Sequence, residues 1–181
     1  MKLILDIGCG NKKLSEPGYK TIGLDYILES KADVLADLNK IPLLPFKDNS
    51  FQMVYLSHVL EHISDPVKVI ADIRRTVKNG GTVIIKVPHH SNYRAYEIHH
   101  KNYWNYFSLD PLCSYPGKSA EQKKLFVMKS KRIILRITKS KFRKIGHFFE
   151  NIVNQFPYKY ENYLHHFLPA YEIIFELEII K

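Results

Sequence analysis

The stretch LILDIGCGNKK, residues 3–13, decides the fold of this chain. Its first five residues are apolar except for Asp6, as in a strand that is buried on both faces of a parallel sheet. Gly8 and Gly10 follow at once. Glycine permits tight turns and lets a ligand approach the backbone more closely than a side chain would allow. The stretch therefore predicts a first strand followed by a loop that holds a ligand.

Length and composition favour one soluble globular domain. The chain has 181 residues, of which 45% are hydrophobic and 25% charged. Cys9 and Cys113 are too few and too far apart to predict a disulfide framework or a zinc site. No apolar run approaches the ~20 residues that cross a bilayer, and the start of the chain lacks the pattern of a signal peptide. We expect a single domain over residues 1–181, located in the cytoplasm.

Strand and helix patterns alternate in the first half of the chain. Apolar runs predict further strands at 21–25, 32–36, 51–56 and 81–87. Between the last two, Asp65 and Pro66 supply a cap and a first helical residue, and the glycines of NGG (79–81) end the helix. This order predicts an α/β sheet with right-handed crossovers.

The first crossover is unusually short. Residues 11–20 contain Pro17 and Gly18 and leave room for about one helical turn. We expect one sheet face to need cover from residues 89–125 or from a second subunit, so that a homodimer is one alternative. In the second half, strands are predicted at 131–138 and 171–180, and an amphipathic helix at 141–154.

Positive charge is concentrated between residues 122 and 149. The net charge is +9, and this segment contains ten lysines and arginines and no acid. Such a segment suits a polyanion, an anionic membrane surface or an acidic substrate. The alternative is an ordinary solvated face.

The glycine loop fits neither common phosphate-binding pattern. A dinucleotide loop needs a third glycine, and a P-loop needs the G-K-[ST] sequence; both are missing. The pattern Asp6-x-Gly8-x-Gly10 instead resembles the first motif of class I S-adenosylmethionine-dependent methyltransferases. Further motifs of the type 11 group follow in register: GLD (23–25), ADL (36–38), FQMVYLSHVLEHISDP (51–66) and NGG (79–81).

This resemblance covers about residues 3–88 and implies a fold. It implies a Rossmann-like, seven-stranded mixed sheet that is mainly parallel, with the last strand antiparallel and helices on both faces, the early crossover helices being shortened. Residues 1–88 would be the cofactor-binding half, and residues 89–181 the substrate lid and C-terminal strands.

The resemblance also implies S-adenosylmethionine as cofactor. Asp25 would accept hydrogen bonds from the ribose, and Asp37 would meet the adenine amino group. The full set of implied cofactor residues is Asp6, Gly8, Gly10, Asp25, Asp37, Leu38 and Ser57. Lys12 stands where the family often has a further glycine.

Candidate catalytic residues follow the 51–56 strand. His58 and His62 are expected near the ligand because ligands bind beyond the carboxyl ends of parallel strands. Histidine titrates near neutral pH and could act as general base. In this family the Glu61-His62 pair also has a structural interpretation.

Candidate substrate residues come from the aromatic segment after Pro88. They are His89, His90, His99 and Trp104. We expect no metal site, because the paired histidines have no cysteine or carboxylate at ligand spacing apart from Glu97.

The functional expectation is methyl transfer to a small molecule or to a glycan or lipid-linked sugar, at oxygen. The C-terminal sequence YENYLHHFLPAYEIIFELEIIK resembles the ends of small methyltransferases of surface-polysaccharide or lipid-linked sugar biosynthesis. One alternative is an RNA methyltransferase that uses the basic 122–149 segment, although LSHV at 56–59 replaces the N-P-P-Y type motif of many base methyltransferases. Another is a catalytically silent cofactor-binding module.

Overall fold

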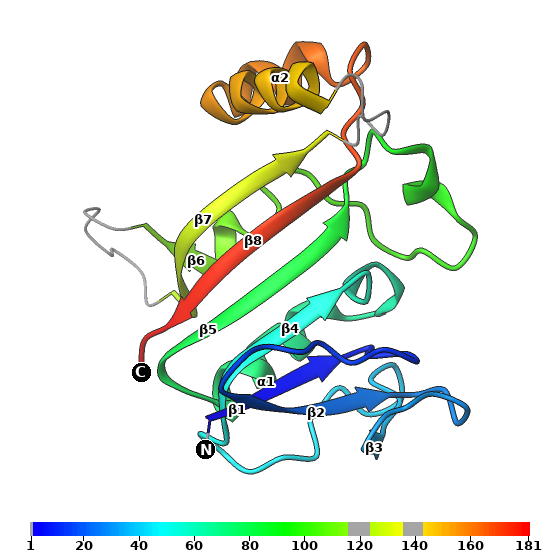
Figure 1. Cartoon of the computed structure of the whole chain (residues 1–181), viewed down its shortest axis with the longest axis vertical. Coiled ribbons are helices and arrows are strands. Elements are labelled where there is room, and N and C mark those ends of the chain that lie inside the picture. The colour runs from blue at the N-terminus through cyan, green and yellow to red at the C-terminus, as the bar shows by residue number, and fades with distance from the viewer. Residues whose placement is uncertain (1, 116–123, 136–142) are drawn as a thin grey trace.

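A computed structural model describes residues 2–115, 124–135 and 143–181 (Figure 1). Parts of three predicted segments lie outside this range: the basic segment 122–149, the strand 131–138 and the helix 141–154.

One mixed sheet of eight strands organises the described residues. Its order is β3-β2-β1-β4-β5-β8-β7-β6. The bounds are β1 Lys2–Ile7, β2 Tyr19–Asp25, β3 Val34–Leu35, β4 Phe51–Ser57, β5 Val77–Pro88, β6 Cys113–Ser114, β7 Phe126–Ile134 and β8 Glu172–Ile179. The neighbours from β3 to β5 pair in parallel, whereas β8 is antiparallel to both β5 and β7. The predicted mixed sheet with an antiparallel last strand is confirmed, with eight strands instead of seven because the two-residue β6 adds an edge.

The central strands are buried as their sequences predict. Ile4, Leu5 and Ile7 of β1 are at most 1% exposed, because β1 lies between β2 and β4. In β8 the buried residues alternate with partly exposed ones, as expected for a strand that presents two different faces. The hydrophobic core follows this sheet from one half of the chain to the other.

Helix α1 (Pro66–Thr76) begins where the sequence predicts. The Asp65 side chain accepts a hydrogen bond from the Lys68 amide, and Pro66 opens the first turn. Val69, Ile70 and Ile73 face the core. The helix ends at Thr76, however, before the predicted NGG stop, because β5 already begins at Val77.

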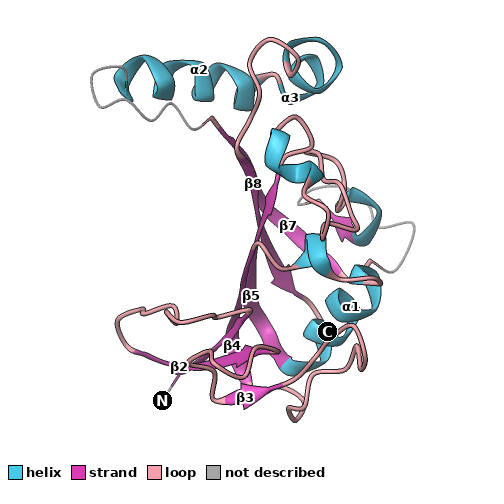
Figure 2. Cartoon of the chain, turned by 90° about the vertical axis from the view of Figure 1, so that its right-hand side faces the viewer, coloured by secondary structure: helices cyan, strands magenta, loops and turns pink. Residues whose placement is uncertain are grey.

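The early crossovers contain loops in place of helices. No helix occurs between β1 and β4 among the described residues. Figure 2 shows α1 on one face of the sheet and loops on the other. The expectation of helices on both faces is therefore not met at the crossovers between β1 and β4. The early crossover helices, which were predicted to be short, are absent from the described residues there.

Helix α2 (Arg143–Gln155) packs at the far end of the sheet, beside β7 (Figures 1 and 2). Asn154 holds it there by donating to the Ile133 carbonyl and accepting from the Ile133 amide, both at 2.8 Å. The predicted apolar stripe instead faces outward, with Ile145, Phe148 and Phe149 exposed. A short helix α3 (Pro157–Lys159) and one π turn lead back to β8.

Candidate active site

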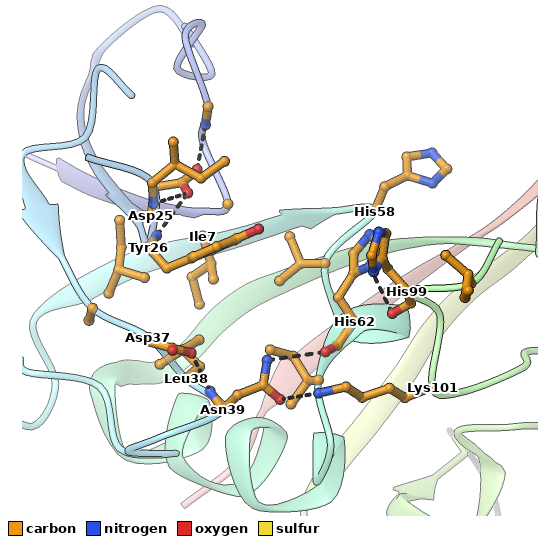
Figure 3. Close-up of a pocket in the computed structure, with 18 residues that line it drawn as sticks. Ile7, Asp25, Tyr26, Asp37, Leu38, Asn39, His58, His62, His99 and Lys101 are labelled. Carbon is orange, nitrogen blue, oxygen red and sulfur yellow. Dashed lines mark hydrogen bonds between the residues drawn. The ribbon is translucent and has the colours of Figure 1, made fainter. Parts of the chain in front are cut away.

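A cavity of about 640 Å³ opens at the carboxyl ends of β1, β2 and β4 (Figure 3). Ligands bind at this edge of parallel sheets. Eight of the residues predicted for the site line it: Gly8, Gly10, Asp25, Asp37, Leu38, His58, His62 and His99. The fold thus gathers residues from both halves of the chain around one cavity.

The two loop glycines are needed for different reasons. Gly8 has φ +70°, and a Cβ there would lie 2.3 Å from Cγ2 of Val59. Gly10 has φ +52° with open space beside it. Both positions are in the left-handed region that favours glycine. Gly8 additionally lets the loop pack against the residues that follow β4.

Asp25 closes the glycine loop. Its carboxylate accepts hydrogen bonds from the amides of Gly10 (2.8 Å), Tyr26 (2.8 Å) and Ile27 (3.0 Å). A carboxylate has about four acceptor positions, so about one remains for a ligand. The arrangement thus leaves Asp25 able to accept one hydrogen bond from a ligand hydroxyl group, fewer than the resemblance to the family implies.

Asp37 and Leu38 form the opposite wall from the loop (Figure 3). Asp37 accepts a hydrogen bond from the Asn39 amide at 3.0 Å, and Leu38 is 3% exposed. Asn39 continues this wall, and its side chain binds the His62 carbonyl and the Ser64 amide. The wall is thereby tied to the segment that follows β4.

Asp6 and Ser57 line a different cavity of about 580 Å³ on another side of the loop. Asp6 accepts a hydrogen bond from the Leu14 amide at 2.7 Å, and burial raises the pKa of its carboxyl group. In this position Asp6 fixes the course of residues 8–14. The geometry gives no support to direct contact of Asp6 or Ser57 with a ligand in the main cavity.

His58 is held between two carboxylates. Its Nε2 lies 3.0 Å from Oε2 of Glu172, and its Nδ1 lies 3.3 Å from Oε1 of Glu61. The hydrogen bond with Glu172 and the neighbouring Glu61 raise the pKa of His58 to about 9. A histidine that is protonated at neutral pH cannot accept a proton, so the predicted general-base role of His58 finds no support here. Its ring points away from Asp25 and Asp37 (Figure 3).

His62 lies on the cavity wall beside His99 (Figure 3). Nδ1 of His62 is 3.4 Å from the His99 carbonyl. The ring of His100 is close to that of His62, with centroids 4.6 Å apart. Glu61 precedes His62 and is fully buried. We call Glu61, His62 and His100 the pocket cluster.

His89, His90 and Trp104 do not line either cavity. His89 is fully buried, and Trp104 is 6% exposed. Both histidines bond Glu161, which the C-terminal segment brings beneath them. We call His89, His90 and Glu161 the lid cluster. The geometry places these predicted substrate residues in a packed region away from the main cavity, leaving His99 as the predicted substrate residue on its wall.

Several cavity residues were not predicted. Tyr26 and Ile27 follow Asp25 directly, and Asn39 follows the ADL motif, so adjacency to the motifs was an available signal. Lys101 had no such signal. Its ammonium group bonds Asn39 (3.1 Å) and Ser64 (2.8 Å), contacts that only the fold creates.

The residues around the main cavity suit a ligand without phosphate. Two carboxylates, Asp25 and Asp37, line it, and its two cations are engaged elsewhere: Lys101 by Asn39 and Ser64, and His58 by Glu172. The glycine loop has open space beside Gly10, where no atom lies within 4 Å of the position of a Cβ. This combination fits the hydroxyl groups and positive charge of S-adenosylmethionine better than a nucleotide phosphate.

Comparisons with known proteins agree with this assignment. The family model of the methyltransferase domain matches residues 5–85. A demethylmenaquinone methyltransferase of Renibacterium salmoninarum is 27% identical over 111 residues, covering 55% of this chain and 47% of that protein. A ubiquinone biosynthesis O-methyltransferase of Ralstonia nicotianae is 32% identical over 113 residues, covering 52% and 46%. The matches span less than half the length of these relatives.

Solved structures share the fold at low identity. A methyltransferase from Archaeoglobus fulgidus superposes with a TM-score of 0.58 and 15% identity, covering 98% of this chain and 86% of that one. The Haemonchus contortus phosphoethanolamine N-methyltransferase 2, solved with S-adenosylmethionine, superposes with a TM-score of 0.62 and 17% identity. The match covers 99% of this chain and 48% of that one.

The sheet order, the glycine loop and the family match together define the class. Residues 5–85 form a class I S-adenosylmethionine-dependent methyltransferase domain of the type 11 kind. S-adenosylmethionine is the cofactor of this class. Among the helices of the described residues, none is both long enough and apolar enough to span a membrane.

Proposed function

We propose that the protein binds S-adenosylmethionine in the 640 Å³ cavity and methylates an oxygen of a small-molecule, glycan or lipid-linked sugar acceptor. The observation that carries this proposal is the convergence of Gly8, Gly10, Asp25 and Asp37 on that cavity. The cofactor, when bound, supplies an electrophilic methyl group.

The residues of the chain would position the reactants. Asp25 keeps the glycine loop closed and offers its remaining acceptor position to a ribose hydroxyl group. Leu38 and Asp37 form the surface proposed for the adenine. Holding two reactants in a reactive orientation can itself lower a barrier by several kcal/mol, on the order of 7–11 in favourable cases. The acceptor is expected beside His62 and His99, on the opposite wall.

The basic segment 122–149 supports the RNA alternative and contact with an anionic membrane less strongly than its sequence alone suggests. Three of its described cations already have acidic partners: Lys129 pairs with Glu178, Lys131 with Asp110 and Arg132 with Glu150. These pairs reduce the charge available to a polyanion. Small-molecule and sugar acceptors therefore have priority over RNA in an activity screen.

Calorimetric titration with S-adenosylhomocysteine tests the cofactor site. We expect one-to-one binding by the wild type, and a loss of at least about tenfold in affinity for Asp37→Ala, since a hydrogen bond to a charged group contributes ~1.5–3 kcal/mol. Asp25→Ala should weaken binding further because it also releases three loop amides.

Asp65→Ala is the matched control. It removes an aspartate that caps α1 away from the cavity and should leave cofactor affinity unchanged. Affinities of both cavity variants equal to that of the wild type would contradict the proposed site. No binding by the wild type would contradict both the methyltransferase and the silent cofactor-binding module, whereas binding without turnover of any acceptor would favour the silent module.

A further inference from the structure

The pocket cluster has the composition of a metal site. One ligand atom from each of Glu61, His62 and His100 lies within 4.8 Å of the others. Bonds of ~2.0–2.2 Å to zinc place neighbouring ligand atoms ~3–4 Å apart, so small side-chain adjustments would close the site. Two imidazoles and one carboxylate leave coordination positions open, as in metal sites that also bind a substrate or water.

The Glu61 carboxylate has little hydrogen bonding among the described residues. Its side chain is fully buried, and neither oxygen has a hydrogen bond of good geometry there. Its one close charged neighbour is Nδ1 of His58, at 3.3 Å from Oε1. A buried carboxylate is costly unless it is paired and hydrogen-bonded or binds a metal. Oε2 is therefore a buried oxygen without a hydrogen-bond partner among the described residues, and it is available as a metal ligand.

The two histidines are oriented as metal ligands usually are. Nδ1 of His100 lies 3.0 Å from the Ala95 carbonyl, and Nδ1 of His62 lies 3.4 Å from the His99 carbonyl. A carbonyl only accepts, so each Nδ1 carries the hydrogen in the neutral ring and each Nε2 keeps its lone pair. Metal-bound histidines commonly donate their other ring N–H to a carbonyl in this way.

The lid cluster, which is similar in composition, is excluded by its hydrogen bonds. Nδ1 of His89 accepts from the Ser91 amide at 3.0 Å, so the hydrogen of the neutral ring is on Nε2, directed at Glu161 (3.1 Å). Glu161 also accepts from the Tyr106 amide and faces Nε2 of His90. No lone pair of His89 is left for a metal ion.

We propose that Glu61, His62 and His100 bind a divalent first-row transition-metal ion at the edge of the cofactor cavity. Nitrogen ligands favour zinc, cobalt or iron over magnesium, which prefers oxygen ligands. His62 lines the cavity, so an ion bound to it would lie next to the place expected for the acceptor.

A role for the ion in the reaction rests on the proposed function. A hydroxyl group bound to such an ion has a lowered pKa. The ion would thus favour the ionised form of an acceptor hydroxyl group without requiring His58 as a base. The proposed metal site replaces the expectation of no metal. That expectation was based only on ligands that are close together in the sequence.

Zinc titration of chelator-treated full-length protein, followed by calorimetry, tests the binding itself. Cobalt absorption spectra report the ligand geometry independently of enzymatic activity. The wild type should bind one ion, and His100→Ala should weaken binding by more than the ~10–100-fold seen when an outer-shell partner is lost. Magnesium should not displace cobalt.

His99→Ala and His90→Ala are the controls, because they remove neighbouring histidines outside the pocket cluster and should bind zinc as the wild type does. Glu61→Gln, checked for its circular dichroism spectrum, is a second test. Equal affinity of wild type and His100→Ala, or a loss only in His90→Ala, would overturn the metal site. Calorimetry of the metal-free wild type with S-adenosylhomocysteine separates the two proposals. If the cofactor analogue binds although zinc does not, the metal site fails and the cofactor site stands.

Discussion

The pocket cluster and the lid cluster each combine two histidines with one glutamate, but their hydrogen bonds differ. In the lid cluster, Glu161 is surrounded by donors, including the Tyr106 amide at 2.7 Å. In the pocket cluster, Glu61 is fully buried, and its one close polar partner among the described residues is Nδ1 of His58, at 3.3 Å. The same residue types therefore stabilise the fold in one place and leave a binding capacity in the other. Composition alone does not separate these two outcomes.

The largest expected effect is on stability when each glutamate is changed to glutamine in metal-free protein. Glu161→Gln should lower the free energy of unfolding by about 3 kcal/mol, because it breaks a buried, hydrogen-bonded charge network. Glu61→Gln should change it by less than ~1 kcal/mol, because it removes a buried charge that has few favourable contacts. Urea unfolding measures both, and equal losses would remove the distinction between the clusters.

The pH dependence should follow Glu161. Burial would raise the pKa of this carboxyl group, but hydrogen bonds from His89, His90 and the Tyr106 amide lower it from 4.5 to about 2. A lowered pKa in the folded state stabilises the protein above the unfolded-state pKa, and the stabilisation is lost as pH falls from ~5 toward 2. The difference in unfolding free energy between wild type and Glu161→Gln should shrink by ~3 kcal/mol in that range. A constant difference would mean that the charge of Glu161 is not what stabilises the lid cluster.

A smaller effect is expected at His58, which links Glu61 to Glu172. This residue has φ +57°, a conformation that costs most non-glycine residues about 1 kcal/mol or more. His58→Ala should cost about 1–2 kcal/mol, since solvent screens an ion pair of a partly exposed ring. His58→Gly should be ~1 kcal/mol more stable than His58→Ala. Thermal unfolding compares the two, and equal stability would show that the backbone at this position is not strained.

Much of the cofactor half could be predicted from sequence because its signals are local. Apolar runs gave β1, β2 and β4, and Asp65 with Pro66 gave the start of α1. The glycine and aspartate motifs follow strands directly, and a parallel sheet brings its carboxyl ends to one edge. The placement of Gly8, Gly10, Asp25 and Asp37 around one cavity follows from that geometry.

The histidines were harder to assign because their roles depend on distant partners. His58 was predicted as a base, but Glu172, which is 114 positions away, supplies the hydrogen bond that raises its pKa. His89 was predicted to meet a substrate, but Glu161 and Tyr160 enclose it. Protonation and burial are set by the full surroundings of a group, which no local pattern contains.

The sequence by itself determined the α/β class, the glycine loop and the cofactor aspartates, since strand periodicity and backbone conformational preference act over a few residues. Only the tertiary structure decided which face of α2 meets the sheet, which histidines reach the cavity, and which glutamate lacks donors. Those properties arise when β8 inserts between β5 and β7 and when the chain after β5 returns over the end of β4. Contacts between residues far apart in the chain thus separate the hydrogen-bonded lid cluster from the open pocket cluster.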